Sequence, residues 1–192
     1  MSNRHRKKLP RKMARPLPLT LPLLWLMTDE RVTDAALLAA AARLPKGRAG
    51  IVFRHYRSAP DVRRALFDGL LAIARRRRLV LVLAGDARMA AAWRADGVHG
   101  DGYRVTRPLL RSRAVHDARE AVAASGADLC FVSPLFPTRS HPGAGALGRV
   151  RFAALARRVD APVMALGGVR RGHRRSLRGM GAAGWAAIDG LT

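Results

Sequence analysis

Short blocks of apolar residues alternate with longer segments in which apolar residues recur at helical spacing, from residue 23 to the end of the chain. Continuous apolar blocks of this length, bounded by polar or glycine-rich stretches, are typical of buried strands. We therefore expect eight strands, at Leu24 to Thr28, Gly50 to Arg54, Leu79 to Leu83, Gly97 to His99, Arg113 to Val115, Leu129 to Ser133, Val163 to Leu166 and Trp185 to Ile188.

The intervening segments predict helices at Asp34 to Arg43, Pro60 to Arg75, Asp86 to Arg94, Asp117 to Ser125, Arg149 to Val159 and Arg174 to Met180. Asp34 and Asp86 are the expected N-caps of their helices, since a short side chain with an acceptor oxygen can bind the free N–H groups there. The segment after His99 is short and poorly patterned, and no residues remain for a helix after the eighth strand.

Eight strand-and-helix repeats in one chain of 192 residues predict an α/β protein with a single TIM-type (β/α)8 barrel, trimmed at its C-terminal closure. We assign the barrel to residues 16–192. In such a barrel the chemistry is carried by the loops at the carboxyl ends of the strands. An open doubly wound sheet is the alternative, but it normally has a glycine-rich phosphate turn after its first strand, where this chain has Thr28-Asp29-Glu30.

The net charge of the chain bears on which partners it could bind and says nothing about the fold. The chain has 36 basic and 13 acidic residues, which gives a formal net charge of +23. This charge favours contact with nucleic acid, anionic surfaces or phosphorylated metabolites. Arginines are nevertheless scattered through the helices, as in Arg75 to Arg78, and such runs are usually solvated faces. Residues 1–15 are predicted to be a basic disordered tail that binds nucleic acid without specificity.

Cys130 is the only cysteine, so a disulfide within the chain is excluded and a reducing compartment fits. Its apolar neighbours, Leu129 to Val132, predict a buried and unreactive thiol. The apolar stretch Pro16 to Met27 follows basic residues, but it is too short to span a bilayer and has no small-residue cleavage site. We expect a cytoplasmic protein without membrane association.

Six strand-end motifs, in this order and spacing, resemble those of thiamine-phosphate synthases and the related TenI thiazole tautomerases. The motifs are Leu26-Met27-Thr28-Asp29, Phe53-Arg54, Ala95-Asp96-Gly97-Val98-His99, Pro134-Leu135-Phe136-Pro137-Thr138, Ala165-Leu166-Gly167-Gly168-Val169 and Gly181-Ala182-Ala183-Gly184. The resemblance covers residues 23 to 190, and it implies the barrel fold and a hydroxyethylthiazole phosphate as the small-molecule partner.

Glycines after the last strands fit a phosphate site on physical grounds as well. Gly167 and Gly168 follow the seventh strand and Gly190 the eighth, where barrels commonly bind phosphate through exposed backbone N–H groups. A glycine-rich turn without a ligand is the alternative. The resemblance adds Thr138 and Ser140 as hydrogen-bond donors and Arg139 as a source of positive charge.

Several polar residues of the synthase pattern are replaced. Of a Gln-x-Arg-x-Lys run after the second strand only Arg54 remains, with Val52 and Tyr56 at the outer positions. Ala84-Gly85 stands where the synthase has a magnesium-binding Asn-Asp pair, which leaves Asp86 and Asp101 as displaced candidates. Mg²⁺ is usually anchored by one or two carboxylates, so we predict no metal site and no cofactor.

Two further positions differ near the expected phosphate. The synthase's Thr-x-Thr-Lys is here Thr138-Arg139-Ser140-His141, so a lysine has become His141. A serine near the thiazole phosphate has become Asp189, whose carboxylate would repel a phosphate unless it faces elsewhere.

After the fifth strand, Val115-His116 before an acidic helix resembles the tautomerase branch, in which this histidine shuttles protons. An imidazole can accept and donate a proton near neutral pH, although a histidine here could also serve only to cap the helix. We therefore expect a divergent synthase or a tautomerase with His116, Arg54 and His141 as catalytic residues, and a homodimer is compatible with either. The alternative is a catalytically silent barrel that binds phosphorylated ligands or RNA through its arginines.

Overall fold

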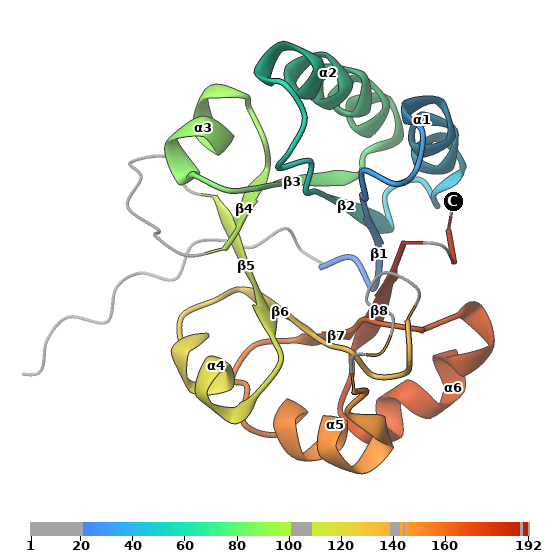
Figure 1. Cartoon of the computed structure of the whole chain (residues 1–192), viewed down its shortest axis with the longest axis vertical. Helices are drawn as coiled ribbons and strands as arrows, with labels where there is room; N and C mark the ends of the chain where they lie inside the picture. Colours follow the sequence, from blue (N-terminus) through green and yellow to red (C-terminus); the bar gives the residue numbers. More distant parts are fainter. Residues whose placement is uncertain (1–20, 101–108, 139–142, 144, 189, 192) are drawn as a thin grey trace, which may run out of the picture.

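The computed structural model describes residues 21–100, 109–138, 143, 145–188 and 190–191, and in it eight parallel strands close into a barrel (Figure 1). Each strand pairs with the next along the chain, and β8 pairs with β1. The predicted fold class is confirmed. The strands are β1 (Leu24–Met27), β2 (Ala49–Phe53), β3 (Val80–Ala84), β4 (Gly97–His99), β5 (Leu110–Val115), β6 (Leu129–Val132), β7 (Val163–Ala165) and β8 (Gly184–Ala187).

The helices surround the barrel, and all six predicted helices are present, most of them shorter than expected. They are α1 (Asp34–Arg43), α2 (Pro60–Arg77), α3 (Ala87–Ala92), α4 (Ala118–Ala123), α5 (Gly148–Ala156) and α6 (Arg174–Leu177), with 3-10 turns η1 (Arg171–His173) and η2 (Arg178–Met180) on either side of α6. None of the helices in the described part of the chain is long and apolar enough to cross a membrane.

Two local predictions are corrected. The N-cap of α1 is Thr33 and not Asp34, because the Thr33 hydroxyl accepts the N–H of Ala36 and leaves Asp34 in the first helical turn. Strand β5 begins at Leu110, three residues before the predicted start, because Ser112 faces inward while the outward Arg111 pairs with Asp128. The predicted N-cap at Asp86 is confirmed, since its carboxylate accepts the N–H groups of Arg88 and Met89.

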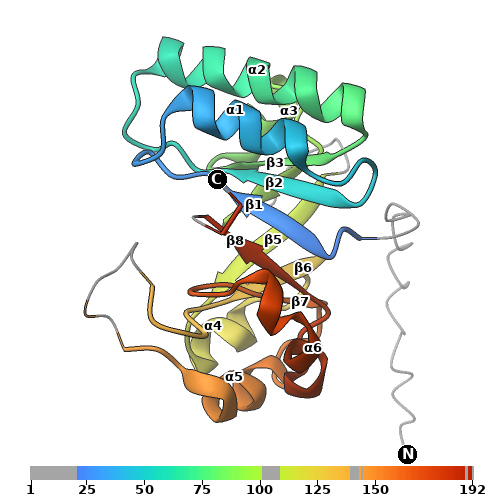
Figure 2. The same cartoon turned by 90° about the vertical axis from the view of Figure 1, so that its right-hand side faces the viewer.

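Side chains of alternate strand residues fill the interior of the barrel. Trp25 packs edge-on against Phe131 with 5.6 Å between ring centroids, and Met27, Val52, Val82 and Met164 complete the same cluster. The remaining strand residues point outward and pack under the helices in two separate groups. One group lies beneath α1, α2 and α3 and the other beneath α4, α5 and α6, and these two sets of helices cover opposite sides of the barrel (Figure 2).

Glycine is required at position 50 by the interior packing. Gly50 pairs with Trp25 across β1 and β2, and a Cβ atom placed on Gly50 would fall within the indole ring of Trp25. Trp25 is fully buried and its Nε1 donates to the carbonyl of Pro22 at 2.7 Å, so the ring is fixed in place.

We expect Gly50→Ala to lower the free energy of unfolding by about 1–3 kcal/mol, because the added methyl group overpacks the barrel interior. Gly179→Ala is the matched control, since a Cβ at Gly179 meets no atom within 4 Å. Urea unfolding followed by tryptophan fluorescence measures both variants. Equal stability of the two would show that the interior of the barrel can relax around the indole.

Candidate functional site

The inward-facing residues at the carboxyl end of each strand form the mouth of the barrel. In β2 the inward series Gly50 and Val52 continues to Arg54, and in β4 the last inward residue is His99. In β6 the series continues to Ser133, which is buried. Because the strands are parallel, these polar groups lie at the same end of the barrel, where barrel enzymes have their active sites.

Arg54 is held at the mouth by the end of β1. Its backbone N–H donates to Thr28 Oγ1 at 2.9 Å, and its Nε donates to the Thr28 carbonyl at 3.1 Å. Its Nη2 lies 3.8 Å from a carboxylate oxygen of Asp29. Burial lowers the pKa of the Arg54 guanidinium from its ordinary value, and the charge of Asp29 opposes that effect. The cation is therefore fixed in orientation while part of it stays accessible to a ligand.

The carboxylate of Asp29 forms ion pairs with two arginines, Arg31 and Arg54. Burial alone would raise its pKa, but hydrogen bonds from Arg31 and the charges of Arg31 and Arg54 bring the pKa below the ordinary value of 3.8. The carboxylate consequently stays charged under physiological conditions, and it orients Arg54.

His99 forms part of the polar floor below the mouth. Its Nδ1 lies 3.0 Å from Ser112 Oγ, and its ring packs edge-on against Phe131 at 5.6 Å. Burial, followed by the positive charges of Arg54 and protonated His116, lowers the pKa of His99 from 6.5 to about 4. His99 is thus neutral at physiological pH. Its pKa responds to Arg54 and His116, which are both expected from the sequence to be site residues.

His116 follows the last residue of β5 and pairs with the helix that comes next. One oxygen of Glu120, Oε2, lies 2.8 Å from His116 Nδ1 and also accepts the His116 backbone N–H at 2.6 Å. Such a pair holds Nδ1 protonated and leaves Nε2 as the basic nitrogen. The N-cap of α4 is Asp117, whose side chain accepts the N–H of Glu120 at 2.8 Å, so the capping role belongs to Asp117.

The glycine pair after β7 is in the left-handed region, with φ of +87° at Gly167 and +62° at Gly168. A Cβ on Gly167 would lie 2.7 Å from Pro134, and one on Gly168 would lie 2.8 Å from the Phe136 Cβ. Tight packing against the loop after β6 is therefore sufficient to require glycine. Within the described part of the chain, the N–H groups of both glycines form no hydrogen bond and stay available as donors.

The ends of β7 and β8 lie close together. A Cβ on Gly190 would be 3.3 Å from the Val169 carbonyl oxygen, so the turn after β8 contacts the turn after β7. Thr138 is half-buried after β6. The other residues predicted near the phosphate, Arg139, Ser140, His141 and Asp189, lie outside the described residues, as does Asp101.

The residues that replace the expected metal and pyrophosphate ligands have other surroundings. Asp86 caps α3 with its carboxylate, and Tyr56 is 63% exposed in the loop after β2. Over the described ranges, no group of three or more His, Cys, Asp or Glu side chains could hold a metal ion. Cys130 is buried on the outer side of β6, and burial raises the pKa of its thiol to about 11, which fits the predicted unreactive group.

Sequence reasoning missed His99, Ser112 and Ser133 as parts of the site. The available signal was the period of two within each strand, which places His99 and Ser112 on the inward side once one inward residue is known. It also missed Glu120 as the partner of His116, although a spacing of four residues is typical of side chains that meet near a helix start.

Comparisons with known proteins agree with the fold and the strand-end motifs. A family model described as thiamine monophosphate synthase matches residues 24–191. The chain is 30% identical over 189 residues to the thiamine-phosphate synthase of Methylococcus capsulatus, covering 91% of this chain and 84% of that protein. It is 32% identical over 181 residues to the thiamine-phosphate synthase of Haloarcula marismortui, covering 86% and 82%.

Two further similarities differ in coverage. A thiamine biosynthesis bifunctional protein of Geobacter sulfurreducens is 29% identical over 180 residues, and the alignment spans 88% of this chain but 36% of that longer protein. Among solved structures, the thiamine phosphate pyrophosphorylase of Pyrococcus furiosus superposes with a TM-score of 0.70 at 22% identity, covering 86% of this chain and 85% of that chain. The structural likeness supports the fold.

The buried His99 predicts a pH-dependent stability. The unfolded chain binds a proton at this residue below pH 6.5, whereas the folded protein does so only near pH 4. The contribution of neutral His99 to the free energy of unfolding is therefore fully present above pH 6.5. It is lost as the pH falls toward 4, and the free energy of unfolding decreases by at most about 1.4 kcal/mol per pH unit. His99→Asn, which can keep a hydrogen bond to Ser112, should reduce this slope between pH 7 and 5.

Urea unfolding at several pH values measures the slope for each protein. His55, which is also buried and has a lowered pKa, is present in both proteins and serves as the constant background. Parallel stability curves for the variant and the parent would show that His99 takes up its proton in the folded state as readily as in the unfolded chain.

Proposed function

The chain belongs to the thiamine monophosphate synthase family of thiamin biosynthesis, and on that premise we propose that it binds a thiazole phosphate at the barrel mouth and transfers a proton on that ligand through His116. The observation that carries the proposal is the pair formed by His116 Nδ1 and Glu120 Oε2 at 2.8 Å, directly after β5.

The pair supplies what proton transfer requires. Glu120 fixes the tautomer with the proton on Nδ1, so Nε2 can remove a proton from one ring atom of the thiazole and return it to another. The double bonds of the ring shift, and no other group enters or leaves. While His116 carries the extra proton, the negative charge of Glu120 stabilises the imidazolium, as a carboxylate does in a catalytic triad.

The rest of the mouth supports binding of the anionic ligand. Arg54 has an accessible guanidinium that Thr28 and Asp29 hold in place, and guanidinium binds phosphate oxygens in two-point contacts. The N–H groups of Gly167 and Gly168, which form no hydrogen bond with any described residue, and the adjacent turn at Gly190 would provide neutral donors for a phosphate. Thr138, Arg139, Ser140 and His141 are proposed to complete the site from the loop after β6.

A second candidate is a divergent thiamine-phosphate synthase, and the names of the curated relatives favour it. That reaction expels pyrophosphate, whose accumulating charge is usually stabilised by a metal ion with lysine and arginine donors. Here Ala84-Gly85, Tyr56 and His141 stand where the family has metal-binding or cationic residues. Proton transfer needs none of these groups, so the site fits it better.

We expect His116→Asn to lower the turnover of a thiazole phosphate tautomer by about 100-fold or more, the usual contribution of a general acid–base group, while ligand affinity changes little. Glu120→Gln is the positioning control. It keeps an acceptor for Nδ1 but removes the charge, so kcat should fall less than in His116→Asn with KM unchanged. Absorbance assays of tautomerisation and calorimetric binding of the thiazole phosphate measure both.

Unchanged turnover in His116→Asn would refute the proposed proton transfer. Formation of thiamine phosphate by the purified protein, together with growth of a thiamin auxotroph that lacks the synthase, would instead establish the second candidate. Loss of all ligand binding at moderate salt would favour the catalytically silent barrel, because purely electrostatic contacts with several phosphates weaken by ~10³ or more as salt rises.

We also expect no tight, Mg²⁺-dependent binding of an aminopyrimidine pyrophosphate. Arg54 and Arg139 can contact phosphate oxygens, but guanidinium groups cannot coordinate a cation. Calorimetric titration with and without Mg²⁺ measures the difference. A large metal-dependent gain that disappears in Asp86→Ser/Asp101→Ala would mean that the metal site has been rebuilt, and serine at 86 preserves the cap of α3.

A further inference from the structure

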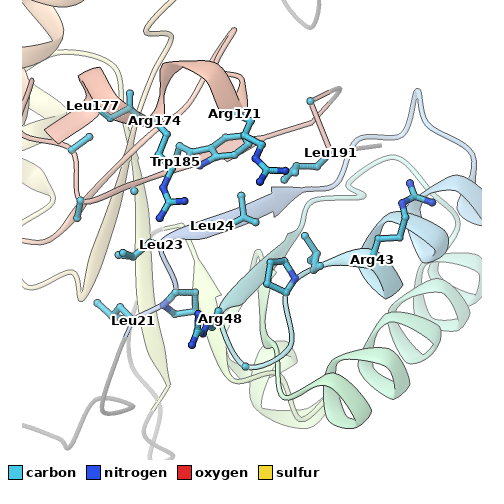
Figure 3. Close-up of a pocket in the computed structure, with 18 of the residues that line it drawn as sticks. Leu21, Leu23, Leu24, Arg43, Arg48, Arg171, Arg174, Leu177, Trp185 and Leu191 are labelled. Atoms are coloured by element: carbon cyan, nitrogen blue, oxygen red, sulfur yellow. The ribbon is translucent and has the colours of Figure 1, made fainter.

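A groove of about 880 Å³ runs along the outer surface of the barrel where β8 pairs with β1, between α1 and α6 (Figure 3). It is separate from the interior cluster and lies on the side wall of the barrel, although its upper end reaches Gly190. The proposed proton transfer at His116 does not use the groove, and Gly190, which is also proposed to lie near the phosphate, is the residue that the two surfaces share.

The floor of the groove is apolar. Leu24 and Trp185, which pair across β1 and β8, lie between the two helices (Figure 3), and Leu44 and Leu177 are further apolar residues of the lining. Leu23, which directly precedes β1 at the amino-terminal end of the strand, is 46% exposed.

The rim of the groove is strongly basic. Among the residues that the structure describes, the lining contains five arginines and no aspartate or glutamate; the arginines are Arg43, Arg48, Arg171, Arg174 and Arg178. Within the part of the chain that the structure describes, none of these five guanidinium groups forms an ion pair or a side-chain hydrogen bond. An apolar floor between unpaired cations on two sides complements a surface with the opposite arrangement.

We propose that this groove docks an amphipathic helix of a partner protein, with an apolar stripe against Leu24 and Trp185 and acidic residues on both flanks facing the arginines. Helices pack on apolar surfaces at axis separations of about 8–10 Å, and a docked helix would lie in the groove between α1 and α6. The acidic flanks determine which helices bind, since an apolar stripe alone would not distinguish among amphipathic helices.

Charge argues against a second copy of the chain and against residues 1–20 as occupants. A second copy carries a net charge of +23 and would bring further arginines to the rim. The segment of residues 1–20 is also basic, with seven lysines and arginines and no acidic residue; these are Arg4, Arg6, Lys7, Lys8, Arg11, Lys12 and Arg15. An acidic helix from another protein is the occupant that the arginines favour.

A fluorescein-labelled peptide of about 18 residues, which forms roughly 27 Å of helix, tests the proposal on the full chain. It has one leucine stripe flanked by glutamates. Two comparison peptides have the same stripe flanked by lysines, or the same composition with the stripe scrambled. We expect the first peptide alone to bind tightly in fluorescence anisotropy at about 0.15 M salt, where charges are screened beyond about 8 Å.

Variants of the groove identify the binding surface. Arg48→Glu/Arg174→Glu should weaken binding of the acidic peptide by roughly tenfold or more, because two attractive contacts become repulsive. Arg76→Glu/Arg175→Glu makes the same change of charge at exposed positions outside the groove and should weaken it by less than about twofold. Leu23→Ser should weaken it several-fold through loss of the exposed apolar contact.

Four results would overturn the proposal. Equal binding of the scrambled peptide would mean that only the net charge is recognised, and an equal effect of the two arginine pairs would mean that the contact is not in the groove. Absence of binding to the full chain would mean that the groove does not accept a helix. Binding of phosphatidylglycerol vesicles with the same dependence on Arg48 and Arg174 would assign the surface to an anionic membrane.

Discussion

Closure of the barrel by the pairing of β8 with β1 is the constraint on which the rest of the structure depends. Leu24 pairs with Trp185 and Leu26 with Ala187, and this register determines which residues of both strands point inward. Because the pairing is continuous around the ring, inward residues of one strand stand beside inward residues of the next. A slip of one residue would exchange the two faces, so that Trp25 and Met27 would point toward the helices and Leu24 and Leu26 into the interior.

The same constraint explains why the site is composed of residues far apart in sequence. His99 is the last inward residue of β4, and Arg54 and Ser133 continue the inward series just beyond β2 and β6. Closure of the barrel therefore brings all three to the same end. Local contacts then orient them: Thr28 and Asp29 hold Arg54, Ser112 holds His99, and Glu120 holds His116. Only the last of these contacts lies within a single strand-to-helix connection. The site therefore depends on tertiary closure far more than on local sequence.

Much of the fold could be predicted from the chain because buried parallel strands are continuous apolar blocks, as in Ile51 to Phe53 or Leu81 to Ala84. The start of β5 could not, because Leu110-Arg111-Ser112-Arg113 reads as polar until Arg111 is known to pair outward with Asp128. Thr33 and Asp34 are adjacent cap formers, and only the backbone angles of Thr33 decide between them. The role of His99 was hidden for a different reason, since its importance comes from burial beside Phe131 and Ser112, contacts made across the barrel.

The arginines fall into two groups, which differ in whether a carboxylate lies near the guanidinium. Arg75 and Arg111 have carboxylate partners at 2.8 and 3.3 Å that hold neighbouring elements together, whereas Arg54 lies 3.8 Å from the carboxylate of Asp29, which orients it at the mouth. The arginines around the groove have no such partners among the described residues, and they surround an apolar floor that includes the indole of Trp185. Exposed like charges repel one another, so a cluster of this kind lowers stability unless an anionic surface neutralises it. The arginines therefore differ in their surroundings. At the mouth one guanidinium is oriented by a carboxylate and a carbonyl, and on the side wall several guanidinium groups surround an apolar floor, which is the arrangement that the proposed acidic helix would complement.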